Sequence, residues 1–352
     1  MLHPYPARFI PEIPGQALDL LEVDGPVLDP FCGSGTTLAE AGRRGLPSVG
    51  VDLNPIACLI SRVRTQAWSS GGAQVGLEHA RQLREFAAAG GDVAELGERI
   101  PRLSHWFDRW ASEALAGAVD YLSTITDPRW HDRIATAISS AIVRISRQDS
   151  DTRYAAVSQS GDRKTAAVVL GQGVVQVCEW LAANSGPSLP PAEVECRDAL
   201  DLGHLDADRF AAAIFSPPYP NAYEYWLYHK YRMYWLGFDP VAVRHAELGA
   251  RPHYCKANGL TEVDFGRQMG DVFGHLARVL RPNAPAVIVV GDSVIGGRHV
   301  NNGELLVAAA SNQGFTLDVW TERQIRRGRS SFNRAHSRGR KREHVLLLRA
   351  PS

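Results

Sequence analysis

Residues 29–37 read Asp-Pro-Phe-Cys-Gly-Ser-Gly-Thr-Thr and connect an apolar strand end, Val27–Asp29, to an expected helix, Thr36–Arg44. Glycine adopts positive φ and lets a ligand approach the backbone, while the N–H groups of the first helical turn can face that ligand. The dinucleotide pattern G-x-G-x-x-G fails because Leu38 takes the place of the third glycine, and the lysine of a Walker loop is absent. At this point the segment fits either a ligand-binding loop or a generic tight turn.

Asp52 follows about 20 residues later, at the end of a second expected strand, Ser48–Asp52, the spacing at which nucleotide-binding sheets carry an acid. A carboxylate at that strand tip accepts hydrogen bonds from the two hydroxyls of a ribose. The same carboxylate could instead cap a helix over Asn54–Cys58, and the two roles are compatible. Together with the glycine loop, this spacing favours a ligand that contains a ribose.

The segment Ser216-Pro217-Pro218-Tyr219 follows a third expected strand, Phe210–Phe215. Ligands of open α/β sheets bind at the carboxyl ends of strands. Proline fixes φ and has no N–H, so we expect a main-chain carbonyl here to stay unpaired and to form, with the Ser216 hydroxyl, two acceptors for a planar NH₂ group. Tyr219 offers an aromatic face on which a flat base can stack. The alternative is a proline-rich loop with a buried tyrosine.

Three zones of sequence must position these residues. Residues 1–66 predict a βαβ unit, and 67–195 predict a mostly helical insertion because apolar residues such as Ile134, Ile138 and Ile142 recur every three or four positions. Residues 196–352 return to an α/β pattern. The elements expected there are strands over Val194–Cys196, Phe210–Phe215, Ala286–Val290, Leu317–Thr321 and His344–Arg349, the last two as an antiparallel edge hairpin, and helices over Phe265–Leu280 and Gly303–Asn312.

The composition is that of a globular protein. The chain has 352 residues, 45% of them hydrophobic and 22% charged, with 38 Lys and Arg against 38 Asp and Glu. Such values exclude collagen, coiled coils and wholesale disorder. The five scattered cysteines form no CxxC pair, which argues against disulfides and structural zinc, and we expect no metal. We find neither a signal peptide nor an apolar run near the roughly 20 residues of a membrane helix, so we expect a cytoplasmic protein with no membrane partner.

Together these motifs resemble the S-adenosylmethionine-dependent DNA amino-methyltransferases, the N4-cytosine and N6-adenine family. Asp29–Thr37 is similar to their cofactor motif, and Ser216–Tyr219 to their catalytic (Ser/Asp/Asn)-Pro-Pro-(Tyr/Phe) motif. His3–Pro11 resembles the family segment that packs on the methionine end of the cofactor. The match covers roughly residues 1–66 and 196–350, which implies a methyltransferase domain over 1–66 and 196–352, interrupted by the 67–195 insertion.

The resemblance implies a seven-stranded, mostly parallel Rossmann-like sheet with an antiparallel edge hairpin. Phe31, Gly33 and Gly35 would hold the methionine moiety of S-adenosylmethionine, Asp52 the ribose, and Leu53 the adenine ring. Asp198 and Ala199 would contact the adenine amine, with Asp201 as a rival for that role. Cys32 would fill a small apolar space. The full implied cofactor set is His3, Pro6, Phe9, Asp29, Phe31, Gly33, Ser34, Gly35, Thr36, Thr37, Asp52, Leu53, Asn54, Asp198 and Ala199.

In the implied reaction, the Ser216 hydroxyl and the Pro217 carbonyl accept the two N–H groups of an exocyclic amine, so that its lone pair points at the methyl donor. Serine at the first motif position favours N4 of cytosine in double-stranded DNA, flipped out of the duplex to stack on Tyr219. The alternatives are N6 of adenine, an RNA amino group in the same pocket, and a partner-binding protein with a decayed methyltransferase fold. A dehydrogenase is disfavoured by the missing third glycine.

A basic segment supports a nucleic-acid partner. From Arg323 to Arg342 the chain has nine Lys and Arg and no acid, although a solvated basic loop is the alternative. The aromatic stretch Asn221–Phe238 fits either a wall of the base pocket or a core helix. Either the 67–195 insertion or residues 220–265 could read the bases, and the size of the insertion favours it. Oligomeric state and an accompanying restriction or phage-defence system stay open. The residues expected to bind DNA are Arg326, Arg327, Arg329, Arg334, Arg338, Arg340 and Lys341.

Overall fold

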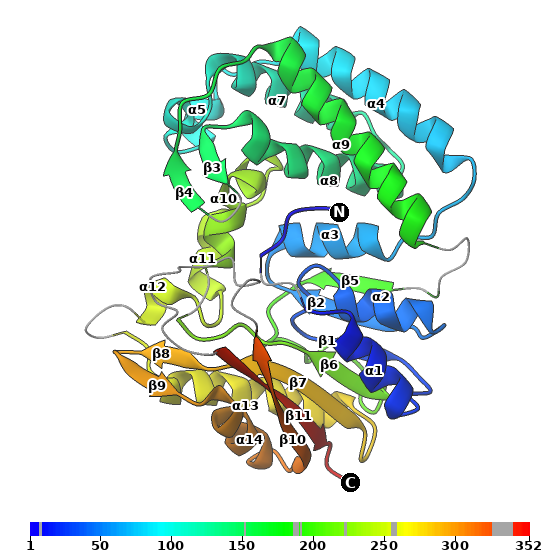
Figure 1. Cartoon of the computed structure of the whole chain (residues 1–352), viewed down its shortest axis with the longest axis vertical. Coiled ribbons are helices and arrows are strands. Elements are labelled where there is room, and N and C mark those ends of the chain that lie inside the picture. Colours follow the sequence, from blue (N-terminus) through cyan, green and yellow to red (C-terminus); the bar gives the residue numbers. More distant parts are fainter. Residues whose placement is uncertain are drawn as a thin grey trace. The chain divides into compact units, whose positions relative to one another are not determined.

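The computed structural model describes residues 1–6, 9–150, 153–185, 190, 192–221, 224–254, 259–325 and 341–352. The chain divides into two compact units, each drawn from several segments (Figure 1). We name them the sheet unit and the helical unit. The sheet unit consists of Arg8–Asn54, Pro190–Tyr225 and Val243–Ser352, and the helical unit of Met1–Ala7, Pro55–Leu189 and Trp226–Ala242.

A seven-stranded sheet forms the centre of the sheet unit. In spatial order its strands are β10 (Thr316–Ile325), β11 (Lys341–Arg349), β7 (Pro285–Gly291), β6 (Ala212–Phe215), β1 (Val27–Asp29), β2 (Ser48–Asp52) and β5 (Ala192–Cys196). Neighbouring strands are parallel except at β11, which runs antiparallel to both β7 and β10. The predicted mostly parallel sheet with an antiparallel edge hairpin is therefore confirmed.

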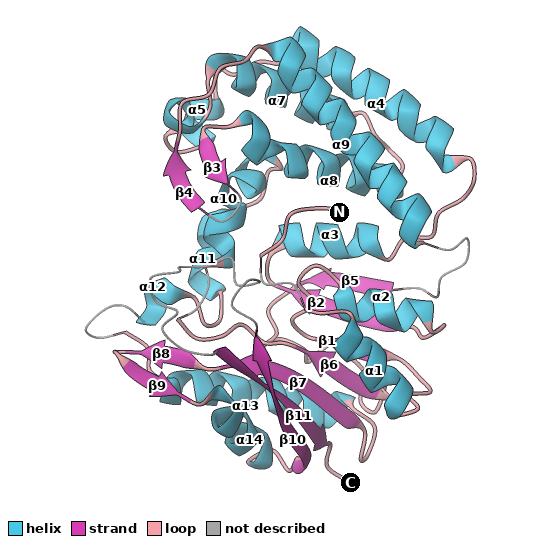
Figure 2. Ribbon diagram, in the orientation of Figure 1, coloured by secondary structure: helices cyan, strands magenta, loops and turns pink. Residues whose placement is uncertain are grey.

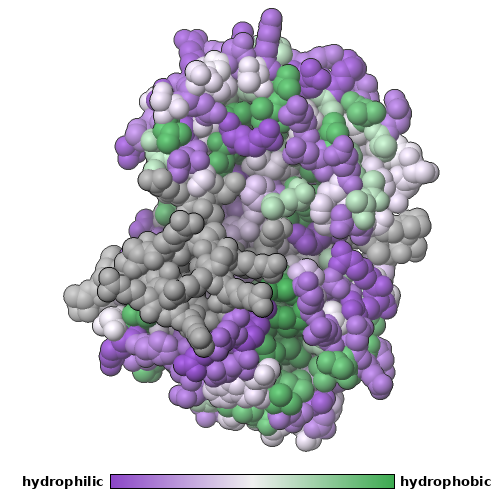
Figure 3. All heavy atoms as spheres, viewed as in Figure 1, coloured by the Kyte–Doolittle hydropathy of each residue, from purple (hydrophilic) through white to green (hydrophobic). Residues whose placement is uncertain are grey.

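Alternate residues of the central strands face two different cores, because side chains of a strand point to opposite faces in turn. Phe215 of β6 faces a large core with helices α13 (Glu262–Val279) and α14 (Asn302–Ser311). Its neighbour Ile214 faces a smaller core with α1 (Glu12–Leu20) and α2 (Thr36–Arg43), so helices cover both faces (Figure 2). Hydrophobic side chains also reach the surface of this unit (Figure 3). Val319 of β10, for example, is 50% exposed.

Short elements complete the sheet unit around the carboxyl ends of its strands. Directly after β7 comes a two-stranded hairpin, whose turn is the pair Gly296-Gly297, with φ of 56° and 79°. Both glycines are in the left-handed region that a tight two-residue hairpin requires. The short elements are α12 (Arg251–Tyr254), β8 (Ser293–Ile295) and β9 (Arg298–Val300), while α11 (Pro240–Ala246) spans the boundary between the units.

The helical unit contains α3 (Pro55–Arg64), α4 (Gly72–Ala89), α5 (Leu96–Arg99), α6 (Leu103–Trp106), α7 (Arg109–Ser123), α8 (Pro128–Ile145), β3 (Gln148–Ser150), β4 (Arg153–Ala156), α9 (Arg163–Asn184) and most of α10 (Tyr225–Trp235). The predicted isoleucine stripe is a packing face, since Ile134, Ile138 and Ile142 of α8 are all buried. This unit is larger than the predicted insertion, because it also includes α3, which packs on α8, and the segments Met1–Ala7 and Trp226–Ala242. The domain assignment itself stays a prediction.

Two details of this unit differ from expectation. The polar stretch after α8, residues 148–152, has the composition of a turn, yet Gln148–Ser150 forms strand β3 of the antiparallel β3–β4 ribbon. The expectation that no segment is long and apolar enough for a membrane helix is wrong for α9, whose 22 residues pass that test by length and composition. Half of its most apolar stretch is buried inside the protein, where it packs on α4 and α8, and the core helix of a globular unit passes the same test.

Candidate active site

The loop between β1 and α2 has the geometry that its glycines predicted. Gly33 and Gly35 have φ of 50° and 75°, in the left-handed region that other residues rarely adopt. The Gly35 N–H donates to the Cys32 carbonyl over 2.7 Å and closes the turn. Buried Cys32 packs on strand β2 at Gly50, where a Cβ would come within 2.9 Å of the cysteine Cβ. Cys32 therefore fills a small space, as predicted.

Asp52 joins this loop to the tip of β2. Its Oδ2 accepts the Gly33 N–H and its Oδ1 accepts the Asn54 N–H, both over 2.8 Å. Burial raises the pKa of Asp52 to about 6, although the two hydrogen bonds act in the opposite direction. The second bond is the capping interaction before α3 that the sequence suggested. The ribose contact expected of Asp52 stays a prediction.

Asp29 lies at the end of β1 and is only 2% exposed. Its Oδ1 accepts the Phe31 N–H over 3.1 Å, which fixes the start of the loop. Burial raises the pKa of Asp29 to about 7 despite that bond and the nearby Thr37 hydroxyl, and the charge of Asp52 adds to the increase. Two carboxyl groups with raised pKa values therefore flank one glycine loop, and a cation bound there would favour their ionised forms.

The proline-containing motif begins directly after β6, and Ser216 has a defined hydrogen-bond role. Its hydroxyl donates to the carbonyl oxygen of Val289 in the neighbouring strand β7 over 2.8 Å. A hydroxyl has a single hydrogen, so the Ser216 oxygen can serve a further partner only as an acceptor. The side chain is half-buried and Pro217 beside it is buried. Because its hydrogen is already donated to Val289, the Ser216 hydroxyl suits a partner that donates a hydrogen bond, such as an amine.

Tyr219 packs against the backbone of strand β7. Its ring contacts β7 at Gly291, where a Cβ would come within 2.9 Å of the Tyr219 Cε2, and its hydroxyl donates to Glu343 Oε1 of β11 over 3.3 Å. The far end of the motif is fixed as well, because Asn221 Nδ2 donates to the Val294 carbonyl over 2.5 Å. Ser216 and Tyr219 are thus held by two successive strands of one sheet.

The glycine loop and the proline motif meet at the same edge of the sheet. Strands β1 and β6 are parallel neighbours, with Leu28 opposite Ala213. The Thr37 hydroxyl donates to the Ile214 carbonyl over 3.2 Å. The rings of Phe31 and Phe215 lie with centroids 5.9 Å apart. The predicted juxtaposition of these two strand ends is therefore present in the fold.

At the tip of β5, Asp198 and its rival Asp201 have different surroundings. Asp198 is half-buried and accepts the Leu200 N–H over 2.9 Å, which shapes the turn after the strand. Asp201 is exposed and forms an ion pair with Arg197 over 2.6 Å. Leu53 is half-buried beside the same strand tip, where its carbonyl accepts from Cys196 Sγ. The adenine contact expected of Asp198 and the buried Ala199, with Asp201 as rival, stays a prediction.

The remaining predicted cofactor residues divide between the units. Ser34 and Thr36 are buried in the glycine loop. Phe9 packs on the smaller core of the sheet unit. His3 and Pro6 belong to the helical unit, where the ring of His3, 1% exposed, forms a hydrogen bond with Ser139 Oγ over 2.9 Å. The role of the N-terminal segment in cofactor binding stays a prediction.

In the aromatic stretch, residues of α10 pack inside the helical unit. Trp226, Tyr231 and Trp235 are buried there, and the Trp235 ring lies 5.5 Å from that of Phe107. This packing agrees with the interpretation of a core helix for these residues. Among the residues that the structure describes, no group of three His, Cys, Asp or Glu side chains could hold a metal ion.

The predicted DNA-binding residues Arg326, Arg327, Arg329, Arg334, Arg338 and Arg340 lie outside the described residues, and Lys341 begins β11. The flanking strands pair antiparallel, as expected. At their ends, Arg323 forms an ion pair with Glu343, and Arg342 one with Glu322. These two arginines of the basic segment therefore already have carboxylate partners.

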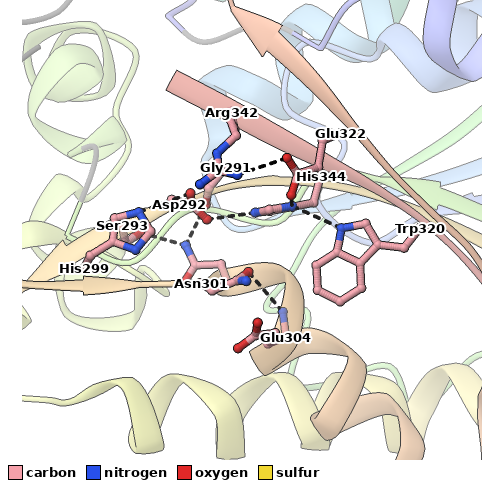
Figure 4. A network of polar contacts seen from close by, with 11 residues as sticks. Gly291, Asp292, Ser293, His299, Asn301, Glu304, Trp320, Glu322, Arg342 and His344 are labelled. Carbon is pink, nitrogen blue, oxygen red and sulfur yellow. Dashed lines mark hydrogen bonds and ion pairs between the residues drawn. The ribbon is translucent and has the colours of Figure 1, made fainter. Parts of the chain in front are cut away.

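The sequence did not predict a polar network that lies beyond the tip of β7 (Figure 4). His344 of β11, 1% exposed, donates from Nε2 to Asp292 Oδ1 over 2.8 Å and accepts the Trp320 indole N–H at Nδ1 over 3.2 Å. These contacts join the end of β7 to β10 and β11. The pair Gly291-Asp292 directly after an apolar strand indicates a turn at the carboxyl end of the sheet. The residues that Asp292 contacts come from other strands, so the sequence could not indicate them.

Comparison with known proteins supplies partial relatives. No protein-family model matches the chain. The type II methyltransferase M.MjaII of Methanocaldococcus jannaschii is 34% identical over 106 residues, which are 29% of this chain and 20% of M.MjaII. M.MvaI, a type II methyltransferase of Kocuria varians, is 37% identical over 67 residues, 18% of this chain and 15% of M.MvaI. The chain thus spans about a fifth or less of these curated relatives, and part of it is similar to type II methyltransferases.

A solved SAM-dependent methyltransferase of Methanosarcina mazei aligns with 99% of this chain and 99% of its own length, at 11% identity and a TM-score of 0.36. A TM-score this low adds nothing to the assignment of the fold. That assignment rests on the strand order and strand directions described above.

Proposed function

We propose that the chain is an S-adenosylmethionine-dependent DNA methyltransferase that transfers a methyl group to the exocyclic N4 amine of cytosine in duplex DNA. The observation that carries the proposal is the state of Ser216. Its hydroxyl hydrogen goes to the Val289 carbonyl, so its oxygen is an acceptor at a strand end next to the glycine loop. The partial similarity to type II methyltransferases supports the same class.

The residues around the glycine loop fit the proposed cofactor. S-adenosylmethionine, when bound, supplies a methyl group on a positively charged sulfur. The loop offers glycine backbone that a ligand can approach closely, and the nearby carboxyl groups of Asp29 and Asp52 suit a cationic ligand. The cofactor would be held by the loop residues from Phe31 to Thr37, by Asp52, and at the β5 tip by Asp198.

At the proline motif, the chain's own groups would orient the amine. Ser216 Oγ and the Pro217 carbonyl accept its two N–H groups, which draws electron density toward nitrogen and holds its lone pair in one direction. Such alignment lowers the entropic part of the barrier, and acceptors placed for the positive charge that develops on nitrogen lower it further. The Tyr219 ring would stack on the base, which must leave the duplex to reach this site.

The choice of base rests on the resemblance, in which serine at the first motif position is associated mainly with N4-cytosine enzymes. An N6-adenine enzyme would use the same acceptors, as would an RNA amino-methyltransferase. The relatives found here do not separate these substrates. Cytosine N4 is therefore the substrate that we propose, and the other two are outcomes of the test below.

The distribution of charge supports DNA as the partner. Nine of the 38 Lys and Arg lie in the acid-free segment 323–342. The rest of the chain therefore has 29 Lys and Arg and all 38 Asp and Glu. The rest of the chain is therefore acidic, and attraction to phosphates would concentrate on this segment. We propose that a cytoplasmic enzyme contacts the DNA backbone there and that the 67–195 insertion reads the bases.

The direct test is incubation of the purified chain with S-adenosylmethionine and unmethylated duplex DNA or tRNA, followed by digestion to nucleosides and mass spectrometry. We expect 4-methylcytosine from DNA alone. Appearance of 6-methyladenine would contradict the cytosine assignment, and methylation of tRNA alone would contradict DNA as the substrate. Absence of S-adenosylmethionine binding in calorimetry would contradict the enzyme itself and favour a partner-binding protein with this fold.

A further inference from the structure

A row of three residues crosses three neighbouring strands beside the proline motif. Gly291 of β7 lies opposite Glu343 of β11, which lies opposite Arg323 of β10. Residues directly opposite one another in a sheet present their side chains on the same face. The row therefore forms one continuous surface on the face that the Tyr219 ring contacts.

Tyr219 lies along this row and touches two of its members. The ring fits over Gly291, since a Cβ there would come within 2.9 Å of Cε2. The phenol hydroxyl then donates to Glu343 Oε1 over 3.3 Å. This contact links the far end of the ring to β11.

The carboxylate of Glu343 is itself fixed. Its side chain is 13% exposed, and its other oxygen, Oε2, accepts the Arg323 Nε–H over 2.6 Å. Ionic hydrogen bonds to guanidinium are directional, so one oxygen anchors the carboxylate to β10 while the second is aimed at the phenol. Arg323 therefore controls the orientation in which Glu343 meets Tyr219.

We propose that Glu343 is a positioning residue, held by Arg323, that keeps the Tyr219 ring in the plane on which the flipped base stacks. This inference rests on the proposed function, because it assigns the ring a base to stack on. Glu343 does not contact the reacting atoms. Its loss should lower the rate of methyl transfer and leave the affinity for S-adenosylmethionine unchanged, since the glycine loop is formed by other residues.

The decisive experiment is a double-mutant cycle on the intact chain. Tyr219→Phe keeps the ring and removes only the hydroxyl, and Glu343→Ala removes the acceptor. We expect each to lower the single-turnover transfer rate on plasmid DNA by roughly tenfold or more, the scale of misalignment effects. Because both changes break the same contact, the double variant should be no slower than either single one. Glu343→Gln, which keeps an oxygen acceptor, should retain most of the rate.

A matched control lies on the same two strands. Arg349 of β11 pairs with Asp318 of β10 over 2.6 Å, away from Tyr219. Asp318→Asn removes one ion pair of the hairpin and should leave the transfer rate as in the wild type. Two results would overturn the proposal: rate losses of Tyr219→Phe and Glu343→Ala that multiply, or an equal loss in Asp318→Asn, which would make the hairpin's stability the cause.

A second measurement does not depend on activity. In protein labelled with ¹³C at tyrosine Cζ, the Tyr219 resonance is assigned by its loss in Tyr219→Phe. It should shift in Glu343→Ala and stay in place in Asp318→Asn. If the resonance does not shift in Glu343→Ala, the inference is overturned, whatever methylation activity the variants show. If the resonance shifts in Glu343→Ala but the wild-type protein methylates no nucleic acid, the contact between Tyr219 and Glu343 stands and the failure lies in the proposed function.

Discussion

The carboxyl group of Asp29 should make the stability of the protein depend on pH in a calculable way. Burial raises its pKa from 3.8 to about 7 in the folded chain. Between these two values the folded state holds a proton that the unfolded state has lost, so the free energy of unfolding falls as pH rises. The slope approaches about 1.4 kcal/mol per pH unit midway between the two pKa values, and Asp29 accounts for a loss of roughly 3 kcal/mol between pH 4 and 7.

Asp29→Asn isolates this contribution, because the neutral amide resembles the protonated acid and still offers an oxygen to the Phe31 N–H. Urea unfolding of both proteins, without ligand, at pH 5 and pH 8 gives the comparison. From pH 5 to pH 8, the stability of the variant relative to wild type should rise by roughly 2–3 kcal/mol. Effects of other groups, Asp52 included, cancel to first order in this difference. Parallel pH profiles for the two proteins would refute the assigned protonation of Asp29.

Three further predictions concern the site itself. Ser216→Ala should lower the turnover number about 10²–10³-fold, which is the usual effect of deleting one preorganised hydrogen-bonding group. The affinity for S-adenosylmethionine, measured by calorimetry, should not change. A weakened affinity would contradict the assignment of Ser216 to the amine. Gly291→Ala should displace the Tyr219 ring, reducing turnover while the unfolding temperature changes little, and unaltered turnover would argue against the stacking role. Arg338→Ala combined with Arg340→Ala should weaken DNA binding and flatten its dependence on salt in fluorescence anisotropy, and a similar loss of cofactor affinity would exclude a phosphate role.

The strands around the glycine loop could be predicted because each is a short apolar run that ends at a turn residue. β1 and β2 have the expected bounds, and β7 extends the expected Ala286–Val290 by one residue at each end. A strand buried on both faces is recognisable from such a run. The two φ values of the loop followed from glycine itself, since few other residues adopt them.

The partners of the site residues could not be predicted, because they depend on strand pairing between distant segments. Nothing near Tyr219 in the sequence indicates Glu343, which is 124 positions away. The same holds for the Val289 carbonyl, 73 positions from Ser216, and for the buried His344 beside Asp292. Residue types identified the candidates, whereas the sheet determined which atoms they meet.

The hydrogen bond from Ser216 to β7 also limits which side chains residue 216 can accept. An aspartate at residue 216 would turn an ionised oxygen toward the Val289 carbonyl, two electron-rich atoms with no hydrogen between them. Such a side chain would have to rotate away, retain its own proton or push the strand aside. An aspartate at residue 216 could therefore keep the contact with β7 only by holding its proton; in its ionised form, either the side chain or the strand would have to move.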